Sequence, residues 1–230
     1  MLMVPVLMGA ANTKVLANGE GFPDIYRLTI QRSPCQDVSY SETGNASMII
    51  KPQDTLIALK YCSIERQAGI GLAGTGLSSV FSIRDLAEVI GISHGEISRS
   101  TQRLEKAQLV SIRGGIFAVA RNLNEWLCYG IRYYCPLERS GYGRGIGTGW
   151  NCQLIKSEML PPQPGWVWAS SQGDKEAELI VPFHNSVPLA ASYDPWLYQA
   201  LSLVEVIRGG KPRELAIARE LLAAHLGVSQ

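Results

Sequence analysis

The sequence FSIRDLAEVIGISHGEISRSTQRLEKAQLV, from Phe81 to Val110, predicts two helices joined by a tight turn and followed by the start of a strand. Ser82 is a favoured N-cap residue, and the apolar residues after it recur at helical spacing. Gly91 ends the first helix, because glycine adopts the left-handed C′ conformation without a Cβ penalty. Ser93 opens the second helix, and Glu96 three residues later completes a capping box. The apolar stripe of the first helix consists of Ile83, Leu86, Ala87 and Ile90.

The second predicted helix has an apolar side and a polar side. Ile97, Thr101 and Leu104 recur at helical spacing, and we expect them to pack inward. The side chains expected to face outward are His94, Ser98, Arg99, Gln102, Arg103 and Lys106. A helix with such side chains can enter the major groove of DNA, where Arg binds guanine and Gln binds adenine through paired hydrogen bonds.

The segment HGEISRSTQRLEKAQLV, from His94 to Val110, resembles the recognition helix of MarR-type winged helix-turn-helix regulators. Ser98-Arg99 and Arg103-Leu104-Glu105-Lys106 stand at matching places, and the resemblance covers residues 51–119, about a third of the chain. It implies a sequence-specific DNA-binding transcriptional regulator, favouring a repressor, with residues 93–107 as recognition helix. It also implies a homodimer that reads a roughly palindromic site on double-stranded DNA.

A short hairpin is predicted directly after the second helix. Residues 109–112 and 116–119 read as strands, and Arg113-Gly114-Gly115 between them forms a tight turn, because paired glycines readily supply positive φ. Arg113 would be available to a phosphate or to the minor groove. This wing is very short and lacks the longer charged tip of the MarR pattern, which argues against reading of the minor groove.

Two other classes of function have to be compared with DNA binding. A three-helix unit with exposed Arg and Gln can serve protein contacts alone, so a winged-helix interaction module, or an antitoxin-like accessory subunit with a protein partner on its C-terminal region, stays open. An enzyme is not favoured, because His94, His184 and His225 lie in unrelated segments and offer no triad. We expect no catalytic residues, no bound metal and no cofactor, and we interpret His184 as a loop or packing residue.

The composition is that of an ordinary globular protein. The chain has 230 residues, 46% of them hydrophobic, and a formal net charge of +1, so nucleic-acid binding would need a local basic patch. The cysteine count is odd and no C-x-x-C spacing occurs, which argues against a disulfide framework or a structural zinc site. No apolar run is long enough to span a membrane. These features favour a cytoplasmic protein. The cysteines are Cys35, Cys62, Cys128, Cys135 and Cys152.

The chain up to residue 120 divides into two regions. Residues 1–47 are rich in turn formers and lack periodicity, so we interpret them as a disordered arm or an over-long start. A DNA-binding winged helix-turn-helix domain is predicted over residues 48–120. Its first helix begins at Pro52, with Asp54 in the first turn, where the helix dipole favours a carboxylate. The glycine-rich residues 67–80 are interpreted as a flexible connector.

A strongly apolar helix is predicted over residues 121–136, with Asn122 as N-cap and Pro136 at its end. It either links the domains and contributes to a dimer, as in MarR-like proteins, or packs on the C-terminal part of its own chain. After it, glycine alternates through residues 138–150. We expect an ordered irregular loop there. The other interpretation is a basic surface, formed by Arg139 and Arg144, that contacts DNA or a partner.

Residues 137–230 are predicted to form a mixed α+β region. Residues 166–168 and 177–181 can pair as strands across the polar turn at 171–174. Two helices follow as an αα-hairpin, the first starting at Asp194-Pro195 and broken by Gly209-Gly210, the second opening at Pro212. The turn carries a small basic tip of Arg208, Lys211 and Arg213. The expected fold class is mainly α with small β: a winged helix-turn-helix domain, an irregular or β segment, and a C-terminal αα-hairpin.

Overall fold

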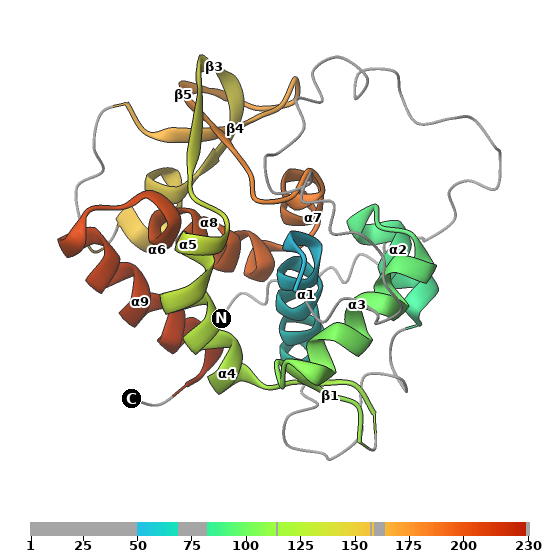
Figure 1. The fold of residues 1–230 in the computed structure, drawn as a ribbon. Helices are drawn as coiled ribbons and strands as arrows, with labels where there is room; N and C mark the ends of the chain where they lie inside the picture. Colours follow the sequence, from blue (N-terminus) through green and yellow to red (C-terminus); the bar gives the residue numbers. More distant parts are fainter. Residues whose placement is uncertain (1–49, 69–81, 114, 157, 159–163, 229–230) are drawn as a thin grey trace, which may run out of the picture. The chain divides into compact units, whose positions relative to one another are not determined.

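The computed structural model describes residues 50–68, 82–113, 115–156, 158 and 164–228, all within one compact unit that comprises residues 32–230. The described chain is mainly helical with small sheets, which confirms the expected fold class at that level (Figure 1). The interpretations of residues 1–47 and of most of the 67–80 connector lie outside the described residues. Among the helices that are described, none has both the length and the apolar character needed to cross a membrane.

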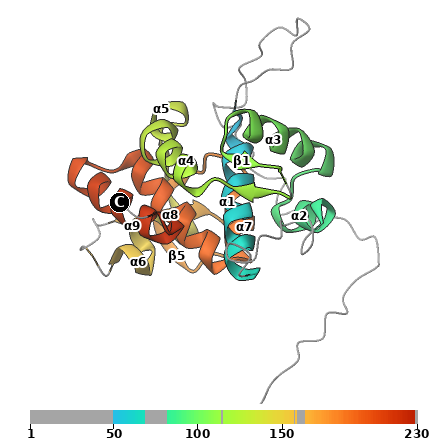
Figure 2. The ribbon, with the colours of Figure 1, turned by 90° about the horizontal axis from the view of Figure 1, so that it is seen from below.

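Helix α1 (Pro52–Ala68) lies at the centre of the described chain. Its side chains are buried on several sides, among them Leu56, Ile57 and Leu59. It contacts both α3 and α8, and Figures 1 and 2 show α2 and α3 on one side of it and α8 and α9 on the other. Because α1 is buried around most of its circumference, it is a core helix that needs neighbours on both sides.

Helices α2 (Ile83–Ile90) and α3 (His94–Lys106) occupy the predicted positions, and their caps are largely those predicted. Gly91 has φ 65° and donates its N–H to the carbonyl of Ala87 at 3.0 Å. Ser82 forms a reciprocal capping box with Asp85, beyond the N-cap role predicted for it. Ser93 accepts a hydrogen bond from the N–H of Glu96, at 3.4 Å. The capping box predicted for Glu96 is wrong, because its carboxylate is bound by arginines instead.

A hairpin of two short strands, β1 (Val110–Ser111) and β2 (Phe117–Ala118), follows α3. The strands are antiparallel, with Val110 opposite Ala118. The side chain of Glu65 accepts a hydrogen bond from the N–H of Ala118, which attaches the hairpin to α1. The predicted hairpin is therefore present, with strands shorter than expected.

The next helical segment has three parts: α4 (Ala120–Glu125), a π-helical turn η5 (Trp126–Gly130) and α5 (Ile131–Tyr134). Its N-cap is Val119 and not Asn122, because the helix already begins at Ala120. The side-chain amide of Asn122, inside the helix, donates to the carbonyl of Gln108 at 2.8 Å. The segment packs on α8 and α9, so of the two expected arrangements the packing on its own C-terminal part is observed. The side chains that it buries are Leu123, Leu127, Cys128, Ile131 and Cys135.

Residues 138–150 are not a loop. They contain an 11-residue strand, β3 (Glu138–Thr148), which pairs antiparallel with β4 (Trp166–Ala169) and with β5 (Lys175–Val181). Because both strands are antiparallel to β3, the strands β4 and β5 run parallel to each other and close a small barrel. They do not form the hairpin that the polar turn at 171–174 predicts. Gly145 pairs with both strands, and a Cβ there would lie 2.0 Å from the carbonyl oxygen of Trp168. This close approach requires glycine.

The C-terminal helices α8 (Pro195–Gly209) and α9 (Pro212–Leu226) form the predicted αα-hairpin, and Asp194 caps α8 by accepting from the N–H of Leu197 at 3.0 Å. Three short helices were not predicted. They are η6 (Gly149–Asn151), α6 (Gln153–Lys156) and α7 (Val187–Ser192).

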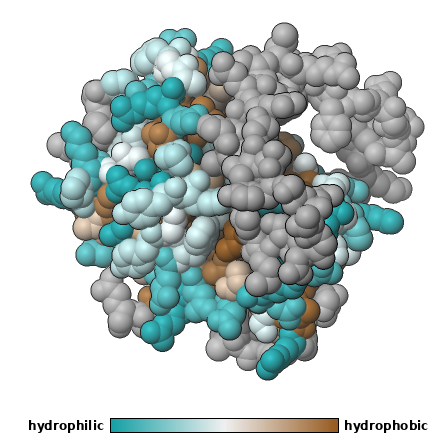
Figure 3. Space-filling model, viewed as in Figure 1, coloured by the Kyte–Doolittle hydropathy of each residue, from teal (hydrophilic) through white to brown (hydrophobic). Residues whose placement is uncertain are grey.

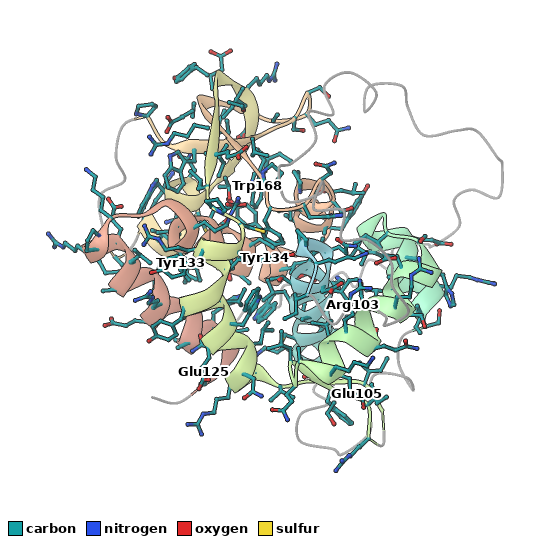
Figure 4. The ribbon with its side chains drawn as sticks, in the orientation of Figure 1. Arg103, Glu105, Glu125, Tyr133, Tyr134 and Trp168 are labelled. Carbon is teal, nitrogen blue, oxygen red and sulfur yellow. The ribbon has the colours of Figure 1, made fainter. Side chains whose placement is uncertain are left out.

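The predicted basic tip of the αα-hairpin has to be corrected at Arg208. This residue is 5% exposed, pairs with the buried Glu205, and donates to the carbonyl oxygens of Cys135 at 2.7 Å and Pro136 at 3.0 Å. It therefore joins α8 to the end of α5, and only Lys211 and Arg213 are exposed at the tip. Glu205 also accepts from the indole N–H of Trp168, which lies where the barrel meets α8 (Figure 4).

The cysteines that the structure describes are core residues. Cys62, Cys128, Cys135 and Cys152 are all buried. Burial raises the pKa of Cys62 to about 12, so its reactive thiolate form is suppressed near neutral pH.

Candidate nucleic-acid interface

Helix α3 is fixed on α1 by the side that was predicted to face inward. Ile97 and Leu104 are fully buried, and Thr101 is 7% exposed. The hydroxyl groups of Thr101 and Tyr61 are hydrogen-bonded at 2.7 Å. Ser100 is also fully buried, and its hydroxyl donates to Asp54 at 2.6 Å. The remaining side of α3 is thereby held in a defined orientation toward solvent.

Arg103 does not face solvent, and the prediction that it does is wrong. Its Nε and Nη2 donate to the two carboxylate oxygens of Asp54, each at 2.7 Å. Asp54 is fully buried and the Arg103 side chain is 11% exposed. Figure 4 shows Arg103 on the side of α3 that faces α1. A buried carboxylate needs a cation and hydrogen-bond donors, and Arg103 supplies both.

Glu96 stands between this buried pair and the exposed surface. Its Oε1 accepts from Nη2 of Arg103 at 2.8 Å and from the amide of Gln53 at 3.1 Å. Its Oε2 accepts from Nε of Arg99 at 2.9 Å and from Nη2 of Arg99 at 2.7 Å. Partial burial by itself would raise the pKa of Glu96, but the hydrogen bonds from Arg103 and Arg99 outweigh it and lower the pKa to about 2. The side chain is therefore a carboxylate at every physiological pH.

The other predicted residues of α3 lie together on its solvent side. His94, Arg99, Gln102 and Lys106 are exposed, and Ser98 is half-buried. These positions fall within an arc of about 140° on a helix with 3.6 residues per turn. Figure 3 shows mostly hydrophilic residues at the edge of the view where α2 and α3 lie in Figure 1. Arg113 is exposed in the hairpin turn that follows.

The charge of this surface is mixed. Asp85 and Glu88 are exposed on the neighbouring helix α2, and Glu105 is half-exposed on α3 (Figure 4). The positive charges are thus a few separate side chains with acidic neighbours. Such a surface favours a small number of defined contacts over general attraction to a polyanion.

A second surface feature was not anticipated from the sequence. Arg121, Glu125, Tyr129 and Tyr133 follow one another at intervals of four residues along α4, η5 and α5. Their exposures are high: 82% and 63% for the side chains of Arg121 and Glu125, and 62% and 81% for Tyr129 and Tyr133. Arg219 of α9 lies 4.6 Å from the ring of Tyr129. We call the four residues Arg121, Glu125, Tyr129 and Tyr133 the tyrosine stripe. Glu125 and Tyr133 are labelled in Figure 4.

His184 lies in the loop before α7, in agreement with its interpretation as a loop residue. Its Nδ1 accepts from the N–H of Ser186 at 3.2 Å, and burial lowers its pKa to about 4. Across the described ranges, no three His, Cys, Asp or Glu side chains come together in a group that could hold a metal ion.

Comparison with known proteins adds no relative. No protein family matches the sequence, and neither curated proteins nor solved structures gave a match.

Proposed function

We propose that this protein is a sequence-specific DNA-binding transcriptional regulator that uses α3 as its recognition helix. The observation that carries the proposal is the polar face of α3, where exposed His94, Arg99, Gln102 and Lys106 lie opposite a buried face packed on α1. The order of α1, α2, α3 and the β1–β2 hairpin supports a winged helix-turn-helix. We do not include Arg103 among the DNA-contacting residues, because it forms an ion pair with the buried Asp54.

Each exposed side chain of α3 has a defined chemical role in this proposal. Arg99 and Gln102 can form paired hydrogen bonds to guanine and adenine in the major groove. His94 and Ser98, near the N-terminal end of α3, can donate to phosphate or to a base edge. Lys106 and Arg113 provide phosphate contacts, which position the helix and contribute much of the affinity.

The regulator is proposed to act as a cytoplasmic homodimeric repressor on a roughly palindromic site. Two copies of α3 about one helical turn of DNA apart would then read successive major grooves. With a formal net charge of only +1, one subunit supplies few phosphate contacts, so a second subunit is needed for useful affinity.

Fluorescence anisotropy with the full chain and a labelled pool of random 30-base-pair duplexes tests the DNA-binding proposal. We expect binding at 50 mM salt that weakens at least tenfold at 200 mM, since a protein with several phosphate contacts loses that much affinity. Arg99→Ala should weaken binding about tenfold to a duplex that the wild-type protein enriches from this pool, because a paired contact to guanine is lost. Arg213→Ala, which removes an exposed arginine from α9, is the matched control and should have no effect.

Failure of the wild-type protein to bind at 50 mM salt would overturn the proposal. So would an equal response to Arg99→Ala and Arg213→Ala, because the contact surface would then lie elsewhere.

A protein-interaction module is the second candidate, and the tyrosine stripe favours it. Aromatic side chains are enriched at protein interfaces, and Tyr129 and Tyr133 are 62% and 81% exposed. Co-purification of a stoichiometric partner by a protein with no affinity for DNA would select this function over the first.

A further inference from the structure

We propose that Glu96 is a positioning residue that directs Arg99 toward the guanine edge of a base pair and away from phosphate. The inference rests on the proposed DNA-binding function and deepens it. It assigns a role to a carboxylate that lies beside the recognition surface and contacts two of the arginines predicted for it.

The first step is the ion pair between Glu96 and Arg99. The Arg99 side chain is 64% exposed, yet its Nε and Nη2 both donate to Oε2 of Glu96. The remaining N–H groups of the guanidinium stay available to a ligand, because arginine has five such donors. Arg99 is therefore held in one orientation before any DNA arrives, which reduces the entropy lost when it binds.

The second step is that Glu96 cannot follow Arg99 outward. Its other oxygen is bound by Arg103 and by Gln53, and its side chain is 19% exposed. Arg103 is in turn fixed by the buried Asp54. The carboxylate therefore keeps its place at the base of Arg99 whichever ligand Arg99 contacts.

The third step is the difference between the two ligands. A phosphate that binds Arg99 brings a full negative charge close to the Glu96 carboxylate, and like charges repel most strongly where water is excluded. The N7 and O6 acceptors of guanine are uncharged and meet no such repulsion. Glu96 thus lowers the affinity of Arg99 for phosphate more than its affinity for guanine.

The test compares two duplexes by fluorescence anisotropy over a range of salt concentrations. One is a duplex enriched from a random pool by the wild-type protein. The other is the same duplex with every guanine replaced by 7-deazaguanine, which removes the N7 acceptor and leaves the phosphates unchanged. Glu96→Gln keeps an oxygen that can accept from Arg103 and removes the charge. Glu105→Gln removes a charge from the same helix without releasing an ion-paired arginine, and is the matched control.

We expect the wild-type protein and Glu105→Gln to bind the guanine duplex about tenfold more tightly than the 7-deazaguanine duplex. For Glu96→Gln that ratio should fall to about two, with tighter binding of the 7-deazaguanine duplex and a salt slope steeper by about one per subunit, because Arg99 becomes a phosphate contact. A residue with only a structural role would weaken binding to both duplexes and would not steepen the slope.

An unchanged ratio and slope in Glu96→Gln would overturn the inference while the DNA-binding proposal stands. Equal affinity of the wild-type protein for the two duplexes would also overturn it. If the wild-type protein enriches no duplex and shows no salt-dependent binding, the proposed function fails and the inference fails with it.

Discussion

Arg103 and Arg99 are four residues apart on α3 and have different surroundings. Arg103 is bound to a fully buried carboxylate, whereas Arg99 lies at the surface. Removal of one partner of a buried ion pair leaves the other charge without compensation in a low-dielectric site. The two residues therefore differ in what they contribute to folding.

We predict that Arg103→Ala lowers the free energy of unfolding by about 3 kcal/mol. Arg99→Ala, the matched control on the same helix, should lower it by less than about 1 kcal/mol, since exposed ion pairs contribute little. Urea unfolding followed by circular dichroism measures both values. Equal losses for the two variants would contradict the assignment of Arg103 to the core.

Gly130 gives a second prediction at the residue scale. A Cβ at this position would lie 2.5 Å from Cε3 of Trp126, within the π-helical turn. Gly130→Ala should therefore cost about 2 kcal/mol, as overpacking does in other cores. Gly95→Ala, where the nearest atom is the end of the Arg99 side chain at 3.7 Å, should be neutral or stabilising by up to about 1 kcal/mol. Thermal unfolding of the two variants tests this, and equal shifts in Tm would contradict it.

The roles of some residues could be predicted from their neighbours in the sequence, and the roles of others could not. The caps at Ser82, Gly91 and Asp194 depend on neighbours within four residues, so the sequence contains the information needed. The pairing of Arg103 with Asp54 joins positions 49 residues apart. It depends on how α3 packs against α1, which helical periodicity does not specify.

At the scale of elements, the tyrosine stripe is the surface of α4, η5 and α5 on which the dimer proposal can be tested. We predict that the wild-type protein sediments as a dimer and that Tyr129→Ala/Tyr133→Ala shifts it to monomer at the same concentration. Tyr142→Ala/Tyr193→Ala removes two tyrosines of similar exposure elsewhere and should stay dimeric. Analytical ultracentrifugation distinguishes these outcomes without DNA. A wild-type monomer at about 100 µM would contradict the dimer.

The secondary structure of two elements, β3 and α7, was not predicted from the sequence pattern. The alternate glycines of β3 resemble a loop in composition, but in the barrel they admit the backbone and side chains of β4 and β5. Helix α7 is not among the predicted helices, although Pro188 lies in its first turn, a position that proline favours. In both elements the outcome depended on neighbours from distant parts of the chain.

At the scale of the whole described molecule, α1 joins the candidate interface to the C-terminal helices. Asp54 near its start binds Arg103 of α3, and Lys60 further along binds Asp194, the N-cap of α8, at 2.7 Å. The Lys60 and Asp194 side chains are 7% and 1% exposed. Loss of the C-terminal helices should therefore destabilise the surface of α3 as well.

The pH dependence of stability is a property of this whole unit. Burial lowers the pKa of His184 to about 4, below its value near 6.5 in an unfolded chain, so the unfolded state binds a proton first as the pH falls. Its contribution to stability is complete above pH 6.5 and is lost between pH 6.5 and 4. We predict that the free energy of unfolding of the wild-type protein falls by on the order of 2 kcal/mol more over this range than that of His184→Gln.

Urea titrations at several pH values measure this effect as the difference between the wild-type protein and His184→Gln. His94→Gln, at an exposed position on α3, is the control and should follow the wild-type curve. Parallel curves for His184→Gln and the wild-type protein would contradict the prediction.

The salt dependence of DNA binding by the full chain tests the central claim most directly. With Lys106 and Arg113 as phosphate contacts in each of two subunits, the account predicts that log K falls with log salt with a slope of about −4. Lys106→Ala should reduce that slope by about 2 in a dimer, whereas Lys156→Ala, an exposed lysine on α6, should leave it unchanged. A slope near zero, or the same slope in Lys106→Ala and the wild-type protein, would contradict the assignment of α3 as a recognition helix.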